Sequence, residues 1–284
     1  MAKTARQIDS IDTAPPFTAD DVARLKAKYE GVATADMLAD LIAGELKGGI
    51  AAVSSFGSES AVLLDMVAAA DKDVPVIFIN TQKIFGETLA YRDELAEKLG
   101  FTDLRVFRPD PRLLAEKDAT SLRWSYDPDG CCDLRKVEPL RRALAPFDAW
   151  ISGRKGFQAG RAALPRFEID EGRLKINPLA DWSKDRIDAS FAAAKLPRHP
   201  LEAQGYPSVG CVPCTSQVQP GEDPRAGRWR GWDKTECGIH DPVFWGAATL
   251  LPPPHSTFAS LMWGEGEVAL SYRPILCDKS ASAL

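Results

Sequence analysis

Short apolar segments alternate with longer helix-like segments over residues 50–152, and this alternation limits the fold more than any other feature of the chain. The apolar segments have the length of strands and lie at 50–54, 74–79, 104–107 and 149–152. Between them, apolar residues at helical spacing predict helices at 59–70, 86–99 and 134–144. Gly100, a residue typical of the position after a helix, would end the second. Strands separated by such helices indicate a mostly parallel, doubly wound α/β sheet, with ligands outside the carboxyl ends of its strands.

The composition is that of a globular protein without excess positive charge. Of the 284 residues, 45% are hydrophobic, enough to bury a full core, and the formal net charge is -5. Nucleic acid and anionic membranes are therefore poor partners, although a local basic site for a small anion is still open. No apolar run reaches the roughly 18 residues of a membrane-spanning helix, so we expect a cytoplasmic protein with no membrane attachment.

A serine-rich loop follows the first predicted strand and precedes a predicted helix. Backbone N–H groups are free at such a position and the helix dipole favours negative charge, so this loop is a candidate anion site. It lacks the lysine of a Walker loop. A plain turn in which Ser58 caps the helix explains the pattern equally well. The candidate residues are Ser54, Ser55, Phe56, Gly57, Ser58, Glu59 and Ser60.

Five of the six cysteines lie in three clusters: a tandem pair, a C-x-x-C motif and a single thiol. In a reducing cytosol, clustered cysteines more often bind metal or act in catalysis than form disulfides. Four thiolates suit a tetrahedral zinc ion or a four-iron cluster, and the adjacency of the tandem pair favours the cluster. Buried thiols that serve as small hydrophobic side chains are a third interpretation. The candidate metal ligands are Cys131, Cys132, Cys211 and Cys214.

Lys136 stands four residues after Cys132, a spacing that puts both side chains on one face of a helix beginning near the tandem pair. A four-iron cluster with four thiolates is a net anion, so a nearby ammonium would stabilise it. The alternative is a solvated surface lysine beside Arg135.

Cys237, the remaining clustered cysteine, is the candidate nucleophile. It follows a loop-like segment rich in glycine and proline. Cations near a thiol favour the thiolate, which is the reactive form. A nucleophile on a mobile segment also fits a reaction in which one thiol meets two partners in turn. The nearby basic side chains are His240, Arg225, Arg228 and Arg230.

Together these motifs resemble the assimilatory sulfonucleotide reductases, and among them the bacterial iron–sulfur adenylyl-sulfate (APS) reductases. The resemblance covers roughly residues 35–240. It rests on CCDLRKVEPL at 131–140, QGYPSVGCVPCT at 204–215 and ECGIH at 236–240. Further support comes from KINPLADW at 175–182 and RAGRW at 225–229.

The resemblance implies an adenine nucleotide alpha-hydrolase-like fold and the reduction of APS to sulfite and AMP, in assimilatory sulfate reduction and cysteine biosynthesis. Cys237 would attack the substrate sulfur to form a thiosulfonate, which thioredoxin or a glutaredoxin-like reductant would resolve. The four other cysteines would bind a [4Fe-4S] cluster, Lys136 would link it to the substrate sulfate, and His240 would stand beside the nucleophile. The loop at 54–60 would take the adenylate phosphate. Further substrate contacts would come from Arg154, Lys155, Arg225 and Arg228.

On this basis we divide the chain into four parts. Residues 1–35 are a leader with one amphipathic helix near 20–29, and residues 36–218 are a nucleotide-binding α/β domain with the iron–sulfur site. Residues 219–241 form a mobile segment that carries the catalytic cysteine, and 242–284 are a tail without an assigned role. The oligomeric state is open, a homo-oligomer included.

Three alternatives stay open at this point. The first is reduction of the 3′-phosphorylated substrate, PAPS, or use of both nucleotides; in the family the four cluster cysteines accompany APS. The second is an adenylating enzyme that releases pyrophosphate from ATP, and the third is an iron–sulfur or zinc module without enzymatic activity. Two segments also depart from the family pattern, Asn80-Thr81-Gln82 after the second strand and Ala159 after Gln158.

Overall fold

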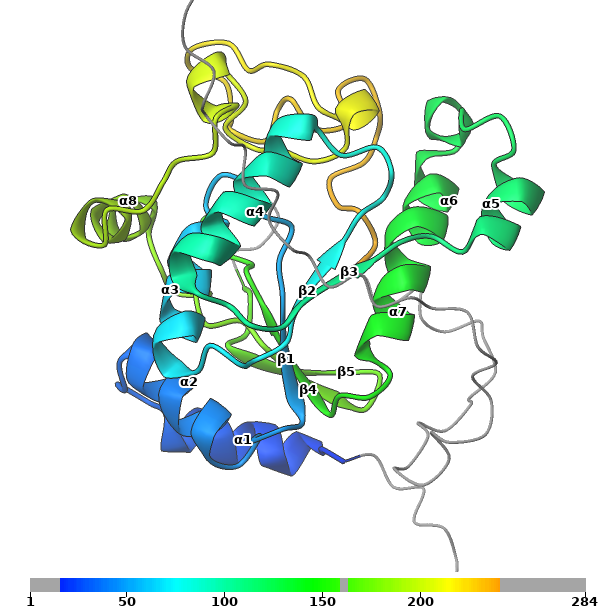
Figure 1. Ribbon diagram of the computed structural model, residues 1–284. Helices are drawn as coiled ribbons and strands as arrows, with labels where there is room; N and C mark the ends of the chain where they lie inside the picture. The colour runs from blue at the N-terminus through cyan, green and yellow to red at the C-terminus, as the bar shows by residue number, and fades with distance from the viewer. Residues whose placement is uncertain (1–15, 159–162, 241–284) are drawn as a thin grey trace, which may run out of the picture. The chain divides into compact units, whose positions relative to one another are not determined.

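The computed structural model describes residues 16–158 and 163–240, which contain a six-stranded sheet (Figure 1). The strand order is β3-β2-β1-β4-β6-β5. All neighbouring strands run parallel except β5 and β6, so the predicted mostly parallel α/β sheet is confirmed. The strands are β1 (Ile50–Val53), β2 (Val76–Ile79), β3 (Leu104–Phe107), β4 (Ala149–Ser152), β5 (Phe167–Asp170) and β6 (Arg173–Ile176).

β5 and β6, which are absent from the strands predicted above, pair as an antiparallel hairpin at one edge of the sheet. Glu171 and Gly172 connect them with φ angles of 51° and 77°. Two consecutive residues with positive φ form the kind of tight turn that matches the right-handed twist of paired strands. The sequence signal for this hairpin was the pair Glu171-Gly172 between two short segments of strand length.

Helices cover both faces of the sheet. Figure 1 shows α3 (Ser60–Ala70) and α4 (Gly86–Leu99) on one face and α7 (Glu138–Leu144) on the other. As predicted, α4 ends at Gly100, which has a left-handed φ of 73°. Within 16–158 and 163–240, no helix is both long and apolar enough to cross a membrane. The other α-helices are α1 (Ala19–Lys28), α2 (Thr34–Ala43), α5 (Pro111–Lys117), α6 (Pro128–Cys132) and α8 (Lys184–Ala193), of which only α1 was predicted.

The helix predicted at 134–144 is the second part of a longer helical segment with one widened turn. The segment begins as α6, passes through the π-helical turn η2 (Asp133–Val137) and continues as α7. In η2 the backbone N–H of Glu138 donates to the carbonyl of Asp133, five residues back. Pro139 has no N–H to donate, which weakens ordinary helical bonding at this point. Turns of this kind are frequent at functional sites.

Two groups of buried apolar side chains, one on each face of the sheet, form the core. Because side chains alternate along a strand, Ala52 of β1 faces α3 while its neighbour Ala51 faces α7. Trp150 of β4 lies on the α7 face with Ala51. Leu25 of α1 belongs to the opposite group, so part of the expected leader packs in the core. Residues 1–15 of that leader and the tail at 242–284 lie outside the described residues.

Candidate active site

A cavity of about 240 Å³ lies at the carboxyl ends of β1, β2 and β4. β1 stands between β2 and β4, so the chain adds strands on one side of β1 and then returns to the other. The crevice at such a reversal is the usual ligand site of doubly wound sheets. Figure 1 shows the yellow and orange segment, which carries the later cysteines, beyond these strand ends. Ser54, Ser58, Lys136, Arg228, Cys237 and His240 all line the cavity.

The serine-rich loop connects β1 to α3, as predicted, but Ser58 does not cap the helix. The capping position belongs to Glu59, whose side chain makes no capping hydrogen bond. The hydroxyl of Ser58 is buried, lines the cavity and has no hydrogen-bond partner among the described residues. A buried hydroxyl of this kind at the start of an 11-residue helix is suited to bind an anionic ligand.

Internal contacts shape this loop. Phe56 has a left-handed φ of 50° and is fully buried, with its ring 5.7 Å from that of Phe78, edge to face. The backbone N–H of Phe56 donates to the hydroxyl of Ser54 at 3.1 Å. The hydroxyl of Ser60 donates to the carbonyl of Gly57 at 2.7 Å. The buried ring of Phe56 and these two hydrogen bonds therefore fix the conformation of the loop. Other residues of the loop, among them Ser54 and Ser58, line the cavity.

Arg154 and Lys155 lie in the cavity wall, each next to a carboxylate. The ammonium of Lys155 is 3.2 Å from Glu59, and that lysine is only 6% exposed. The guanidinium of Arg154 is 3.2 Å from Glu168 of β5. A ligand at this wall therefore meets two ion pairs rather than two solvated cations.

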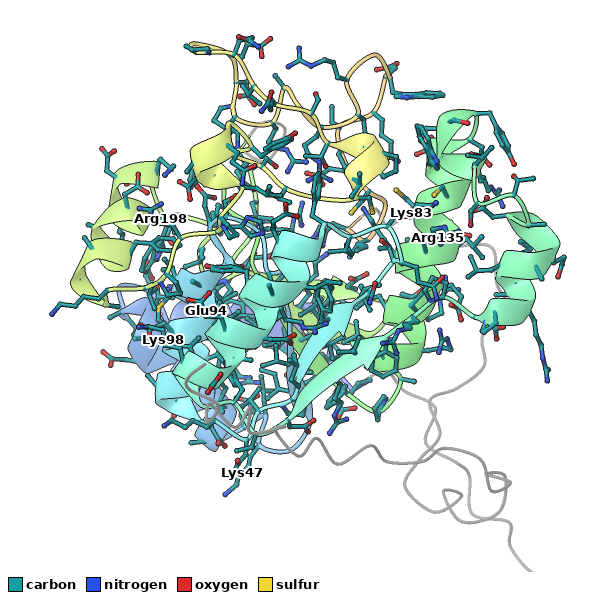
Figure 2. All side chains as sticks on the ribbon, turned by 45° about the horizontal axis from the view of Figure 1, so that its top comes forward. Lys47, Lys83, Glu94, Lys98, Arg135 and Arg198 are labelled. Carbon is teal, nitrogen blue, oxygen red and sulfur yellow. The ribbon has the colours of Figure 1, made fainter. Side chains whose placement is uncertain are left out.

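The four candidate metal ligands meet around one small second cavity, which Lys136 also lines. Cys131 and Cys132 come from the end of α6, whereas Cys211 precedes the short turn η4 (Val212–Cys214) and Cys214 ends it. The C-x-x-C segment contacts the β2–α4 connection, where the N–H of Val212 donates to the carbonyl of Lys83 at 2.8 Å. Figure 2 shows Lys83 and Arg135 next to the yellow sulfur atoms.

The cysteine pocket is polar at its edge and buried at its centre. Burial raises the pKa of Cys131 and of Cys132 to about 11, so without a bound cation both thiols hold their protons at neutral pH. The hydroxyl of Thr81 is 3.2 Å from the sulfur of Cys211. Among the described residues, no three His, Cys, Asp or Glu side chains are arranged to hold a single metal ion. Four cysteine thiols around one pocket are the kind of donor set that a thiolate-bound group requires.

Lys136 links the two cavities. It is 9% exposed, so the interpretation as a solvated surface lysine is wrong. Burial alone would lower its pKa, but the negative charge that Cys211, Cys132 and Cys237 carry as thiolates outweighs burial and raises the pKa above the usual lysine value. Lys136 therefore carries a positive charge between the four-cysteine pocket and the candidate nucleophile.

Arg135, the neighbour of Lys136 in the π-helical turn, forms a buried ion pair. Its guanidinium is 2.6 Å from the carboxylate of Asp118, and the two side chains are 3% and 0% exposed. Arg135 also donates to the carbonyl of Thr81 at 3.0 Å. Arg135 thus ties the tandem-cysteine helix both to the end of α5, through Asp118, and to the loop after β2, through Thr81.

Cys237 lines the larger cavity, held by contacts on both sides of it in the chain. Before it, Lys234 forms an ion pair with Asp129 of α6. After it, the ring of His240 stacks on Trp150 at a centroid distance of 5.8 Å and an angle of 6°. Ile239 packs against the apolar group on the α7 face. The candidate nucleophile therefore lies in the same cavity as the serine-rich loop.

The three upstream arginines differ in their surroundings. Arg228 donates to the carbonyl of Val209 at 3.1 Å and lines the cavity. Arg225 also lines the cavity and is 3.4 Å from Glu236, beside the nucleophile. Arg230 pairs instead with exposed Glu222 and is not part of the cavity wall. Two of the three cations predicted near Cys237 are thus at the site.

Two cavity residues were quoted as motif members without an expected role. Trp229 is 2% exposed and lies under the cations of Arg228 and Lys136, at 4.6 and 5.8 Å from its ring centroid. Thr81 contacts the sulfur of Cys211, although its segment departs from the family pattern. A Cβ at Gly210 would lie 2.2 Å from the guanidinium of Arg228, so a side chain there would displace the end of Arg228.

Comparisons with known proteins agree with the fold and the site. A family model described as the phosphoadenosine phosphosulfate reductase domain matches residues 49–217. The chain is 49% identical to an adenosine 5'-phosphosulfate reductase of Mesorhizobium japonicum over 84% of this chain and 95% of that protein. It is 41% identical to a phosphoadenosine 5'-phosphosulfate reductase of Gloeobacter violaceus over 66% of this chain and 80% of that protein.

The solved structures include a similar fold. The phosphoadenylyl-sulfate reductase of Candida auris superposes with a TM-score of 0.61 at 26% identity, covering 72% of this chain and all of that one. A family match over more than half the chain and relatives of this identity leave no other assignment: the chain belongs to the phosphoadenosine phosphosulfate reductase family.

Proposed function

We propose that this protein reduces adenylyl sulfate to sulfite and AMP with electrons from thioredoxin or a similar dithiol. One observation carries the proposal: a single cavity is lined by Cys237, by the serine-rich helix-opening loop and by the buried Lys136. The names of the relatives at 49% identity support the same reaction.

In the first step, the thiolate of Cys237 attacks the sulfur of the substrate. A bond forms between the two sulfur atoms, the bond from sulfur to the bridging oxygen breaks, and AMP leaves with that oxygen. The product on the protein is a thiosulfonate. Lys136 and Arg228 face the anionic sulfonate and phosphate groups, where positive charge stabilises the transition state.

In the second step, a thiol of the reductant attacks the sulfur of Cys237. Sulfite leaves with the electron pair of the broken sulfur–sulfur bond, and the second thiol of the reductant releases Cys237 by forming its own disulfide. The dithiol is oxidised by two electrons and the sulfonate sulfur is reduced by two. The segment that carries Cys237 has to leave the cavity so that the reductant can approach it.

The serine-rich loop binds the nucleotide phosphate in this proposal. The buried hydroxyl of Ser58 and the backbone N–H groups at the start of α3 offer donors to a phosphate oxygen. Arg154 and Lys155 contribute to the same wall, His240 stands beside Cys237, and Arg225 orders the segment through Glu236. Each of these side chains binds or orients an anion.

We propose further that Cys131, Cys132, Cys211 and Cys214 hold a [4Fe-4S] cluster. Consecutive helical residues point about 100° apart, so the tandem sulfurs diverge and suit two different iron atoms better than one zinc ion. When bound, the cluster supplies a fixed charge that polarises the substrate end of the cavity and passes no electrons. Lys136 then connects that charge to the sulfonate, because it faces both pockets.

The preferred nucleotide is APS, with use of PAPS as the alternative. The four cysteines and the 49% identical relatives named for adenosine 5'-phosphosulfate support APS. A 41% identical relative is named for the 3′-phosphorylated substrate, so steady-state rates with both nucleotides decide the question. A large preference for PAPS would reverse the assignment. The proposed reaction consumes a reduced dithiol, and thiols are kept reduced in the cytosol, so we propose that the enzyme is cytoplasmic.

The test is sulfite release from APS by anaerobically purified protein with thioredoxin, for the wild type, Cys237→Ser and Cys277→Ser. Cys277, the sixth cysteine, provides the matched control for loss of a thiol. We expect a brown iron-containing protein in all three cases, with turnover lost only in Cys237→Ser. A colourless zinc protein would contradict the cluster. Turnover by Cys237→Ser would contradict the mechanism, and metal without sulfite formation would favour a binding module.

A further inference from the structure

Trp150 is a cavity residue to which the reaction steps above assign no role. It lies on β4 and is 1% exposed, and its ring belongs to the apolar group on the α7 face. A buried tryptophan is normally explained by core packing alone. Trp150, however, lines the same cavity as Cys237. Trp150 therefore stands at the boundary between the sheet and the reacting groups.

The sheet holds Trp150 firmly in place. Its neighbour in register on β6 is Lys175, whose ammonium lies 5.0 Å from the centroid of the tryptophan ring. Lys175 is in turn 3.3 Å from Glu168 and 3.4 Å from Asp170, and it is 2% exposed. The indole is thus fixed by a strand and by a buried cation. It offers a rigid surface to whatever packs on it.

The segment that carries Cys237 packs on this surface. His240 stacks on the indole with ring planes only 6° apart, and Ile239 packs against the same apolar group. On the other side of Cys237, Lys234 pairs with Asp129, which is 56% exposed, and its ammonium lies 5.5 Å from the centroid of the Trp229 ring. Glu236 pairs with Arg225, which belongs to the same segment and so does not tie it to the sheet. An ion pair with one exposed partner contributes little to stability, whereas a stacked ring pair in a buried site contributes more.

We propose that Trp150 is a positioning residue that anchors His240 and Ile239 and so keeps Cys237 in the cavity. The inference rests on the proposed function, in which Cys237 has to face the substrate and then leave to meet the reductant. One stacked ring pair suits both needs, because it orients the segment and is weak enough to release it. Trp150 acts only through the segment and touches no reacting atom.

Cleavage after Lys234 by a lysine-specific endoprotease, which leaves the exposed Arg230 uncut, measures the release of the segment. The side chain of Lys234 is 6% exposed and paired with Asp129, so the protease reaches it only when the segment leaves its site. When opening is fast relative to cleavage, the cleavage rate follows the open fraction. Loss of one ring pair raises that fraction by about 2- to 12-fold, the factor that corresponds to ~0.5–1.5 kcal/mol.

Four variants separate the anchor from general loss of stability. Trp150→Leu and His240→Ala remove the stack from either side and are expected to be cut after Lys234 several times faster than the wild type. Trp150→Phe keeps a flat ring and restores slow cleavage. Phe167→Leu removes a buried ring of β5 from the other core group, away from the segment, and leaves the rate unchanged. Mass spectrometry identifies the fragment that ends at Lys234.

The proposal fails if Trp150→Leu and His240→Ala are cut no faster than Phe167→Leu, or if Trp150→Phe is cut as fast as Trp150→Leu. His240→Ala changes no residue of the sheet, so the test holds even if Trp150→Leu does not fold. The double variant Trp150→Leu/His240→Ala should be cut no faster than the faster single variant, because both remove one contact. In sulfite assays, Trp150→Leu should lower kcat with little change in KM. Proteolysis needs no turnover, so absent sulfite formation would overturn the proposed activity and leave the cleavage result unaffected.

Discussion

The buried ion pair between Asp118 and Arg135 offers a sharp test of how the site is supported. The carboxylate of Asp118 accepts two hydrogen bonds from the guanidinium, at 2.6 and 3.1 Å, and one from the backbone N–H of Arg123 at 2.9 Å. With side-chain exposures of 3% and 0%, neither charge can turn to water. Asp118→Asn keeps the shape but leaves the guanidinium without its counter-charge.

The expected loss of stability is large. Breaking a buried pair by neutralising one partner costs about 3–5 kcal/mol. For a protein of this size, ~1 kcal/mol corresponds to roughly 2–4 °C in Tm, so Asp118→Asn should lower the Tm by about 6–20 °C. Anaerobic scanning calorimetry at one fixed scan rate measures the difference.

Asp127→Asn is the matched control. Asp127 pairs with Arg123 at 2.7 Å, but the side chains of the arginine and the aspartate are 23% and 39% exposed. Asparagine can also replace Asp127 as the cap of α6, where the carboxylate accepts from Gly130. We expect a loss below about 1 kcal/mol. Equal Tm values for the two variants would refute the claim that burial makes the Asp118–Arg135 pair important.

Three further predictions concern single residues of the site and its support. Burial lowers the pKa of His199 to about 4, so neutral His199 stabilises the fold above about pH 6.5 and this contribution declines towards pH 4. The stability difference between wild type and His199→Gln in urea should therefore shrink from pH 7 to pH 5, and a constant difference would contradict it. Lys136→Met keeps the volume but removes the charge, so kcat for APS should fall about 10²–10³-fold with the Tm preserved, and a loss below threefold would refute the electrostatic role. Gly210→Ala displaces the guanidinium of Arg228, so the KM for APS should rise about tenfold, as in Arg228→Gln; an unchanged KM would show that Arg228 does not bind substrate.

The regular part of the fold follows from local sequence patterns. Apolar runs of strand length predicted β3 and β4 with the observed bounds, and β1 and β2 with small errors at one end. The positive φ that glycine adopts without strain explains why Gly100 marked the end of α4 correctly. These elements depend on residues close in the chain, which is why sequence alone predicts them.

The missed elements depend on features that periodicity does not register. The turn at Glu171-Gly172 required attention to turn chemistry rather than to apolar runs. The π-helical turn before Pro139 arises from a missing N–H inside an otherwise continuous helix. Local propensity indicated Ser58 as the cap of α3. The helix begins two residues later, at Ser60, and Ser58 lines the cavity instead.

At the site, the sequence motifs identified candidate residues but did not predict the side chains that surround them. The four candidate metal ligands line one pocket and Cys237 lines the larger cavity, while the roles assigned to them stay predictions. The pairing of Lys155 with Glu59, and the stacking of His240 on Trp150, join segments about a hundred residues apart in the chain. Such contacts come from the topology of the sheet, which brings the ends of β1 and β4 together.

The central claim is that Cys237 carries the sulfonate between substrate and reductant. The most direct measurement is mass spectrometry of the protein mixed anaerobically with APS in the absence of any reductant. The account predicts stoichiometric release of AMP and one added SO₃ group on the peptide that contains Cys237, which thioredoxin then removes as sulfite. AMP release without this adduct, or an adduct on any other cysteine, would contradict it.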